Sequence, residues 1–261
     1  MRRAVLIPGA AAVPLALVAL AGCGSQDTSA TASAGSTGEQ RLTVLAAASL
    51  TGSFTTLGKR FEAAHPGTKV TFSFGPSSGL AQQITDGAPA DVFASASAKN
   101  MQTVVDGGQA KNPTTFATNT MEIAVPPDNP GKVIQLSDLA KKDIKVALCQ
   151  AQVPCGTVAA EVFKNAGITV KSVTQEADVK ATLTKVQLGE VDAGLVYVTD
   201  VLAAGDKVKG IPIPADVNAS TSYPIATLTA SKNAALAQQF LDYVLSDDGR
   251  AALKQAGLEA G

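Results

Sequence analysis

Short runs of apolar and β-branched residues alternate with segments of helical periodicity, and this alternation most restricts the possible fold. It is the signature of an α/β protein. The predicted strands cover residues 42–46, 69–74, 91–94, 122–125, 145–148, 195–198 and 223–228. The predicted helices cover residues 50–64, 79–86, 99–106, 136–140, 157–166, 179–189, 234–245 and 248–256. We therefore expect an α/β fold.

Four of the predicted strand-to-helix junctions carry small or capping residues where the helix begins. These residues are Ser49, Ser77 with Ser78, Cys155, and Asp178 with Val179. A helix start leaves N–H groups without partners at the positive end of its dipole, and in open α/β sheets such starts gather where ligands bind. A single helix start of this kind usually has a structural role and binds no ligand. The first two, however, consist of Ala, Gly, Pro and Ser, which leave the backbone open to an anion.

The N-terminal segment predicts export from the cytoplasm. Arg2 and Arg3 precede an apolar run over residues 4–20, as in a secretory signal, so residues 1–22 form the predicted signal peptide. The sequence LAGC, ending at Cys23, matches the lipobox of bacterial lipoproteins and predicts lipidation of this cysteine. An ordinary signal peptide with a chance cysteine is the alternative.

A polar segment follows and separates the signal from the folded body. Residues 24–40 contain almost nothing to bury, so residues 23–40 form the predicted flexible tether. The body then begins near Arg41 and has about 220 residues, enough for two lobes of roughly 100 each. It has no second apolar run of the ~18 to 20 residues that a membrane-spanning helix needs.

The composition argues against nucleic acid as a partner and against an enzyme. With Arg2 and Arg3 removed, 19 basic residues stand against 22 acidic ones, a mildly acidic balance. The single histidine, His65, precedes a proline in a predicted surface turn, so a Ser-His-Asp hydrolase lacks its base. There is no GxSxG, Walker or GxGxxG motif, and no cysteine and histidine set for zinc. Binding is the favoured class, without a cofactor.

Two cysteines remain in the body, Cys149 and Cys155. Outside the cytoplasm such a close pair can oxidise, and its five intervening residues exceed the spacing of a CxxC redox motif. A local disulfide is the favoured interpretation, with two free thiols as the alternative.

Five segments together carry a resemblance to a known family. They are AAASLTGSF, FSFGPSSGLAQQITDGAPADVFASA, QVPCGTVAAEVF, GEVDAGLVYVTD and FLDYVLSDDGRAAL. In this order they resemble the molybdate-binding lipoproteins that serve ABC importers, a family of periplasmic-type binding proteins. The resemblance implies a type II fold of two α/β lobes joined by two crossing segments, near residues 119–121 and 223–225. Lobe I would then comprise residues 41–120 plus 224–261, and lobe II residues 121–223.

The resemblance also implies a binding site. The family binds a tetrahedral dianion with neutral donors, namely two serine hydroxyls in one lobe and backbone N–H groups plus a tyrosine hydroxyl in the other. By motif position, the residues similar to these donors are Ser49, Ser77, Cys155, Val179 and Tyr197. Ala48 and Ser78 are possible additional contacts. Tyr223 and Tyr243 are assigned to packing.

Two departures from the family pattern affect this site. Pro76 stands where some relatives carry a serine, so the choice between Ser77 and Ser78 as second serine ligand stays open. Cys155 replaces a common alanine. A thiol at a helix start tends to ionise and would repel the dianion, and a disulfide to Cys149 would remove that hazard.

The implied function is capture of molybdate, or tungstate, for the membrane permease of an ABC importer. The implied protein is a monomer, lipid-anchored to the outer face of the cell membrane. A binding protein for another anion, sulfate or thiosulfate first, is the nearest alternative. An adhesin or scaffold that uses the same fold is another.

Overall fold

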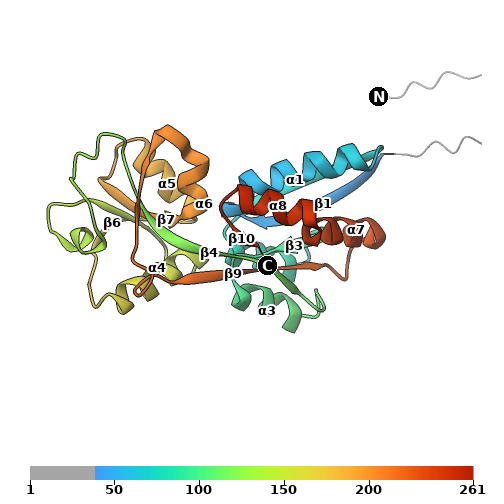
Figure 1. Cartoon of the computed structure of the whole chain (residues 1–261). Helices are drawn as coiled ribbons and strands as arrows, with labels where there is room; N and C mark the ends of the chain where they lie inside the picture. The colour runs from blue at the N-terminus through green and yellow to red at the C-terminus, as the bar shows by residue number, and fades with distance from the viewer. Residues whose placement is uncertain (1–38, 261) are drawn as a thin grey trace, which may run out of the picture. The chain divides into compact units, whose positions relative to one another are not determined.

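Strands and helices alternate along the part of the chain, residues 39–260, that the computed structural model describes (Figure 1). The strands are β1 Gln40–Ala47, β2 Thr68–Gly75, β3 Val92–Ala94, β4 Thr114–Val125, β5 Val146–Cys149, β6 Ser172–Glu176, β7 Ala193–Tyr197, β8 Lys209–Pro212, β9 Ser220–Thr227 and β10 Glu259–Ala260. The predicted signal peptide, Cys23 and most of the predicted tether lie outside the described residues.

Helices occupy most of the connections between these strands. The α-helices are α1 Thr51–Ala64, α2 Ser77–Thr85, α3 Ala98–Asp106, α4 Pro154–Asn165, α5 Val179–Gln187, α6 Val198–Ala204, α7 Ala234–Leu245 and α8 Asp247–Gln255. Short 3₁₀ turns are η1 Ala48–Leu50, η2 Leu136–Ala140 and η3 Gly205–Lys207. None of the helices in the described part is both long and apolar enough to cross a membrane.

The strands form two lobes that share β4. The strand order is β2-β1-β3-β9-β4-β7-β5-β6, with β8 and β10 also paired to β4. In the first lobe β1 is parallel to β2 and β3, and in the second β5 is parallel to β6 and β7. The predicted α/β, two-lobed type II fold is therefore confirmed.

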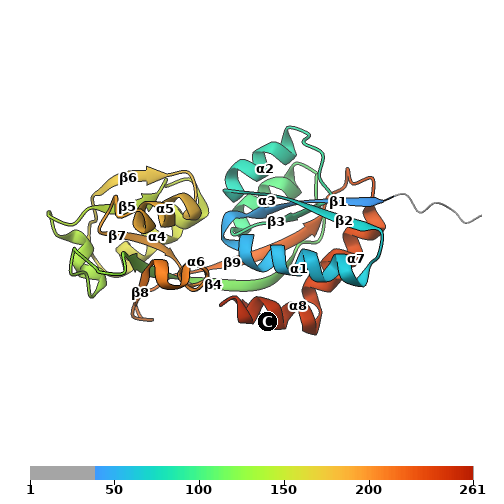
Figure 2. The ribbon, with the colours of Figure 1, turned by 90° about the horizontal axis from the view of Figure 1, so that it is seen from above.

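One strand, β4, passes through both lobes. Residues 114–120 pair with β9, whereas residues 121–124 pair with β7. Both views show β4 and β9 side by side between the lobes (Figures 1 and 2). Strand β9 pairs with residues 114–120 of β4 and with β3, so it runs back toward the first lobe from Ser220 onward, and the predicted crossing at residues 223–225 stays a prediction. The strand begins with the polar residues Ser220–Ser222, and sequence reasoning found only its apolar half.

Side chains of β1 separate the two cores of the first lobe. Leu42 and Val44 belong to the core that includes Phe54 of α1, whereas Leu45 belongs to the core beneath α2 and α3. This follows from the period-two alternation of side chains along a strand. Figure 2 shows the same division, with α2 and α3 on one side of β1 and β3, and α1, α7 and α8 on the other.

Several predicted boundaries differ from the observed ones. Helix α4 begins at Pro154, three residues before the predicted start, because proline suits the first helical position. Strand β4 begins at Thr114, well before the predicted residue 122. The elements β6, α6, β8 and β10 were not predicted. In the case of α6, the apolar run GLVYV conceals the point where β7 ends at Tyr197 and the helix begins.

Candidate ligand-binding site

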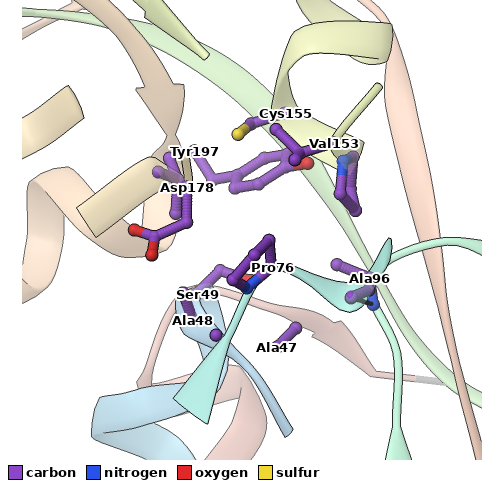
Figure 3. A pocket seen from close by; sticks show the side chains of 13 residues that line it. Ala47, Ala48, Ser49, Pro76, Ala96, Val153, Cys155, Asp178 and Tyr197 are labelled. Atoms are coloured by element: carbon purple, nitrogen blue, oxygen red, sulfur yellow. Dashed lines mark hydrogen bonds between the residues drawn. The ribbon is translucent and has the colours of Figure 1, made fainter. Parts of the chain in front are cut away.

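A cavity of about 20 Å³ lies between the lobes, at the beginnings of four helices (Figure 3). The first lobe contributes residues 47–49, 75–77 and 96, and the second lobe contributes residues 153–155, 178, 179 and 197. A single water needs ~10–15 Å³ on this measure. The cavity therefore has room for one small solute and not for a sugar or a peptide.

Six of the seven residues predicted as ligand contacts line this cavity. They are Ala48, Ser49, Ser77, Cys155, Val179 and Tyr197. Ser78, the alternative to Ser77, does not line it. The structure thus brings together residues that lie as far apart in the chain as Ala48 and Tyr197, while their role as ligands stays a prediction.

The hydroxyl of Ser77 accepts one hydrogen bond and can donate another. Ser77 is the first residue of α2 and is buried. Its Oγ accepts the backbone N–H of Ala96 at 2.9 Å. Because a backbone N–H can only donate, the serine keeps its own proton for another partner. A solute with acceptor oxygens in the cavity would supply that partner.

The side chain of Ser49 is held by a residue that was assigned to packing alone. Ser49 lies in η1, directly ahead of α1, and its Oγ is 2.8 Å from Oη of Tyr223. Tyr223 does pack, with its ring 6.1 Å from that of Phe116, but its hydroxyl also fixes a predicted ligand residue. Tyr243, by contrast, packs on Phe61 as expected.

Tyr197 has a buried hydroxyl with no hydrogen-bond partner among the described residues. It ends β7, and Figure 3 shows its ring along the wall of the cavity that faces Ser49 and Pro76. Burial, followed by Tyr223 and Asp200, raises the pKa of this phenol well above its usual value, so the group stays protonated and can donate. An unpaired buried polar group costs ~1–3 kcal/mol, which an acceptor in the cavity would recover.

Three of the four helix starts around the cavity have no side-chain cap. Their N-cap residues are Ala47, Pro76 and Val153, none of which supplies a capping hydrogen bond. Serine, threonine, aspartate and asparagine are the usual N-caps because they satisfy first-turn N–H groups. Without such caps, no N-cap side chain competes with a solute in the cavity for these N–H groups.

The fourth helix start is capped in part. Asp178 accepts the N–H groups of Lys180 and Ala181 at 2.8 and 2.9 Å. Its side chain therefore satisfies the second and third N–H groups of α5 and leaves that of Val179, the predicted donor, to the cavity side. The N-cap assigned to Asp178 from the sequence is confirmed.

A disulfide joins the end of β5 to the start of α4. The Sγ atoms of Cys149 and Cys155 are 2.03 Å apart. Next to this bridge, a Cβ on Gly156 would overlap the backbone oxygen of Gln150, so the turn that carries Cys155 tolerates only glycine there. These constraints hold the start of α4 in place at the cavity.

The lining of the cavity is almost without charge. Asp178 is the only Asp, Glu, Lys, Arg or His residue in the lining, and its Oδ1 accepts two N–H groups of α5. The nearby cation, Lys180, lies 2.9 Å from the buried carboxylate of Asp200. No cluster of metal-ligating side chains occurs within residues 39–260. The arrangement can hold a compact anion by hydrogen bonds from neutral groups.

Two α/β lobes that enclose one small, donor-lined cavity define a solute-binding protein. The chain belongs to the bacterial extracellular solute-binding proteins, whose family model matches residues 42–259. It is therefore an extracytoplasmic binding component and not an enzyme. Its relatives include the molybdate-binding protein ModA of Mycobacterium tuberculosis, which is 41% identical over 239 residues that cover 91% of this chain and 92% of the relative.

Solved structures support the same fold. The substrate-binding domain of a putative molybdenum ABC transporter from Clostridium difficile is 29% identical, with a TM-score of 0.65, over 85% of this chain and 99% of that domain. The periplasmic molybdate-binding protein of Azotobacter vinelandii is 22% identical, with a TM-score of 0.76, over 84% of this chain and 99% of that one. The second likeness, at this low identity, concerns the fold alone.

Proposed function

We propose that this protein captures molybdate outside the cytoplasm and delivers it to the membrane permease of an ABC importer. The relationship to ModA over nearly the whole chain supports this function, as does a cavity that admits one small solute. Molybdate is the transported ligand in this proposal and not a cofactor.

The observation that carries the proposal is the unpaired hydroxyl of Tyr197 in the cavity wall. The Ser77 proton and the uncapped helix starts add further donors on other sides of the same small space. A fully deprotonated tetrahedral oxyanion presents an acceptor in each of these directions. It satisfies several buried donors at once, and hydrogen bonds to a charged acceptor are worth ~1.5–3 kcal/mol each.

The proposed ligands are the hydroxyls of Ser49, Ser77 and Tyr197 and the N–H groups of Cys155 and Val179. Ala48 is a further contact through its backbone. The absence of Ser78 from the cavity lining supports Ser77 as the second serine ligand. In this arrangement the first lobe comprises residues 41–120 and the segment from β9 onward, and the second lobe comprises the residues between them.

The same chemistry predicts that other oxyanions bind more weakly. Hydrogen phosphate carries an O–H that requires an acceptor, whereas the proposed ligand groups are all donors, and Oδ1 of the one carboxylate in the lining, that of Asp178, already accepts two N–H groups. Sulfate has the charge of molybdate but is smaller, so it cannot contact donors of both lobes at once. Tungstate, which is nearly the same size as molybdate, is a second ligand in this proposal.

The proposed location rests on the N-terminal sequence. LAGC at residues 20–23 supports cleavage ahead of Cys23 and attachment to the outer face of the cell membrane. The protein acts there as a monomer. Cys23→Ala is expected to release the protein from the membrane fraction without a change in molybdate affinity, and a variant that still sediments with membranes would contradict the anchor.

Calorimetry of the wild type against molybdate, tungstate, sulfate, thiosulfate and phosphate tests the function itself. We expect molybdate and tungstate to bind much more tightly than the rest. Preference for sulfate or thiosulfate would identify a different importer substrate. Lack of binding to every oxyanion would favour a scaffold or adhesin that uses this fold.

A further inference from the structure

A chain of buried hydrogen bonds extends from Ser49 to three residues that do not line the cavity. Ser49 contacts Tyr223, Tyr223 contacts Asn119, and Asn119 contacts Thr199. All four residues are buried, with at most 7% of any of them exposed. Tyr223 and Asn119, at 0% and 1% exposed, therefore depend on partners within the network.

The direction of the network is determined at Asn119. The backbone N–H of Thr120 donates to the side-chain oxygen of Asn119 at 3.0 Å. Because a backbone N–H can only donate, the atom that it contacts is the oxygen, and the other terminal atom is the amide nitrogen. This nitrogen lies 2.9 Å from Oγ1 of Thr199 and 3.3 Å from Oη of Tyr223. Both amide protons are thus donated.

The proton of Tyr223 then has one destination. Its Oη accepts from Asn119, and the other partner of this hydroxyl is Oγ of Ser49 at 2.8 Å. Burial raises the pKa of Tyr223 well above its usual value, so the phenol keeps its proton. Tyr223 donates this proton to Ser49. The serine oxygen accepts, so the proton of Ser49 is left for another partner, and Ser49 lines the cavity.

The network also connects residues of both lobes. Ser49 precedes α1 in the first lobe, Asn119 and Tyr223 lie on β4 and β9 where the lobes join, and Thr199 lies in α6 of the second lobe. The side chain of Asn119 is held by hydrogen bonds to Thr199 and to the N–H of Thr120. It therefore fixes the hydroxyl of Tyr223, which in turn orients Ser49. Orienting the donor before the ligand arrives lowers the entropic cost of binding.

We propose that Tyr223 and Asn119 are positioning residues that hold Ser49 as a hydrogen-bond donor toward the bound anion. This inference rests on the proposed function. Tyr223 and Asn119 lie outside the cavity and contribute to the affinity for the anion only through the hydroxyl of Ser49.

A double-mutant cycle tests this dependence, with calorimetry against sodium molybdate for the wild type, Tyr223→Phe, Ser49→Ala and the double variant. Tyr223→Phe keeps the ring and removes the donor. We expect it to weaken binding about 3- to 10-fold, the worth of one neutral hydrogen bond. In the Ser49→Ala background the same change should have almost no effect, because the group through which it acts is gone. Tyr243→Phe is the matched control and should leave affinity unchanged.

A second variant keeps the test decisive if Tyr223→Phe folds poorly. Asn119→Asp replaces the donor amide by an acceptor, so Tyr223 would donate to Asp and Ser49 would turn its proton toward Tyr223. Its loss of affinity should exceed that of Tyr223→Phe and should be smaller in the Ser49→Ala background, where only the added charge acts.

The outcomes separate this inference from the proposed function. Equal effects of Tyr223→Phe with and without Ser49, or no effect at all, would overturn the inference while molybdate binding by the wild type upholds the function. If the wild type prefers another oxyanion, the cycle is measured with that anion. If it binds none, both proposals fail.

Discussion

The rings of Tyr197 and Tyr223 meet edge to face with centroids 6.5 Å apart, yet their hydroxyls differ completely in their partners. Tyr223 is hydrogen-bonded to Ser49 and Asn119, whereas Tyr197 has no partner among the described residues. Buried tyrosine hydroxyls normally find a partner. In our proposal, Tyr223 orients Ser49, whereas Tyr197 donates directly to the ligand.

Replacement of Tyr197 by Phe should therefore have opposite effects on stability and binding. The ligand-free protein should unfold at the same or a slightly higher urea concentration, because the change removes an unpaired buried group. Affinity for molybdate should fall by ~1.5–3 kcal/mol, or about 10- to 150-fold, since a hydrogen bond to a charged acceptor is lost. Urea denaturation and calorimetry measure the two effects. A destabilised variant with normal affinity would show that the hydroxyl serves the core.

Ser49→Ala tests the first-lobe side of the site. Molybdate affinity should fall by about 1.5 to 3 kcal/mol, the usual range for a hydrogen bond to a charged group. The discrimination against phosphate should stay the same, because it arises from the missing acceptor for the phosphate O–H and not from this serine. Competition calorimetry with both anions checks this. Unchanged molybdate affinity would remove Ser49 from the site.

Lys180→Met tests the buried carboxylate beside the site. Burial raises the pKa of Asp200, and the ion pair with Lys180 opposes that rise. A carboxyl group whose folded-state pKa is raised loses stability as the pH increases from its usual value of 3.8 toward the raised value. Without Lys180 this interval widens. We expect a loss of about 1–3 kcal/mol at pH 7, less than for a fully buried pair because Lys180 is 31% exposed.

The loss caused by Lys180→Met should shrink at pH 5, where Asp200 takes up a proton more readily. Urea denaturation of the ligand-free protein at both pH values measures this. Lys185→Met is the matched control, because Lys185 pairs with Glu190 at the surface and such pairs contribute at most ~1 kcal/mol. Equal losses for Lys180→Met at both pH values would mean that Asp200 does not titrate as described.

The disulfide can be tested through the thiolate that Cys155 would form without it. Mass spectrometry of the unreduced protein should show Cys149 linked to Cys155, and full alkylation of both would contradict the bridge. In Cys149→Ala, the thiol of Cys155 at the start of α4 should ionise as the pH rises and repel the dianion. Molybdate affinity should then decline between pH 6 and pH 9 roughly in step with thiolate formation. The double variant with Cys155→Ala should show no such decline.

Most of the cavity could be predicted because its residues belong to local patterns. The small residues around Ser49 and Ser77 and the N-cap at Asp178 can be read from a few neighbouring positions. The resemblance to the molybdate-binding family, whose motifs occur in the same order, then assigned them to one site. The hydroxyl of Tyr223 could not be found in this way, because its partner Ser49 lies 174 positions away and their contact depends on the tertiary packing of the first lobe.

The first half of β4 was not predicted for a different reason. Its first half, TTFATNT, has two exposed residues followed by two buried ones and includes Asn119, which is polar and yet 1% exposed. Asparagine is uncommon in strands, so the pattern did not indicate one. A single asparagine within an otherwise strand-like segment was the sequence signal that could have indicated Asn119.

The near absence of charge from the cavity lining determines how the protein responds to its surroundings. Dissolved ions screen charges over ~10 Å at 0.1 M salt, and they act most strongly on charged side chains that face the solvent. Hydroxyl and N–H dipoles carry no net charge and hold no counterions that a ligand must displace. In our proposal, the affinity for molybdate therefore depends less on ionic strength than it would in a site built from lysine and arginine.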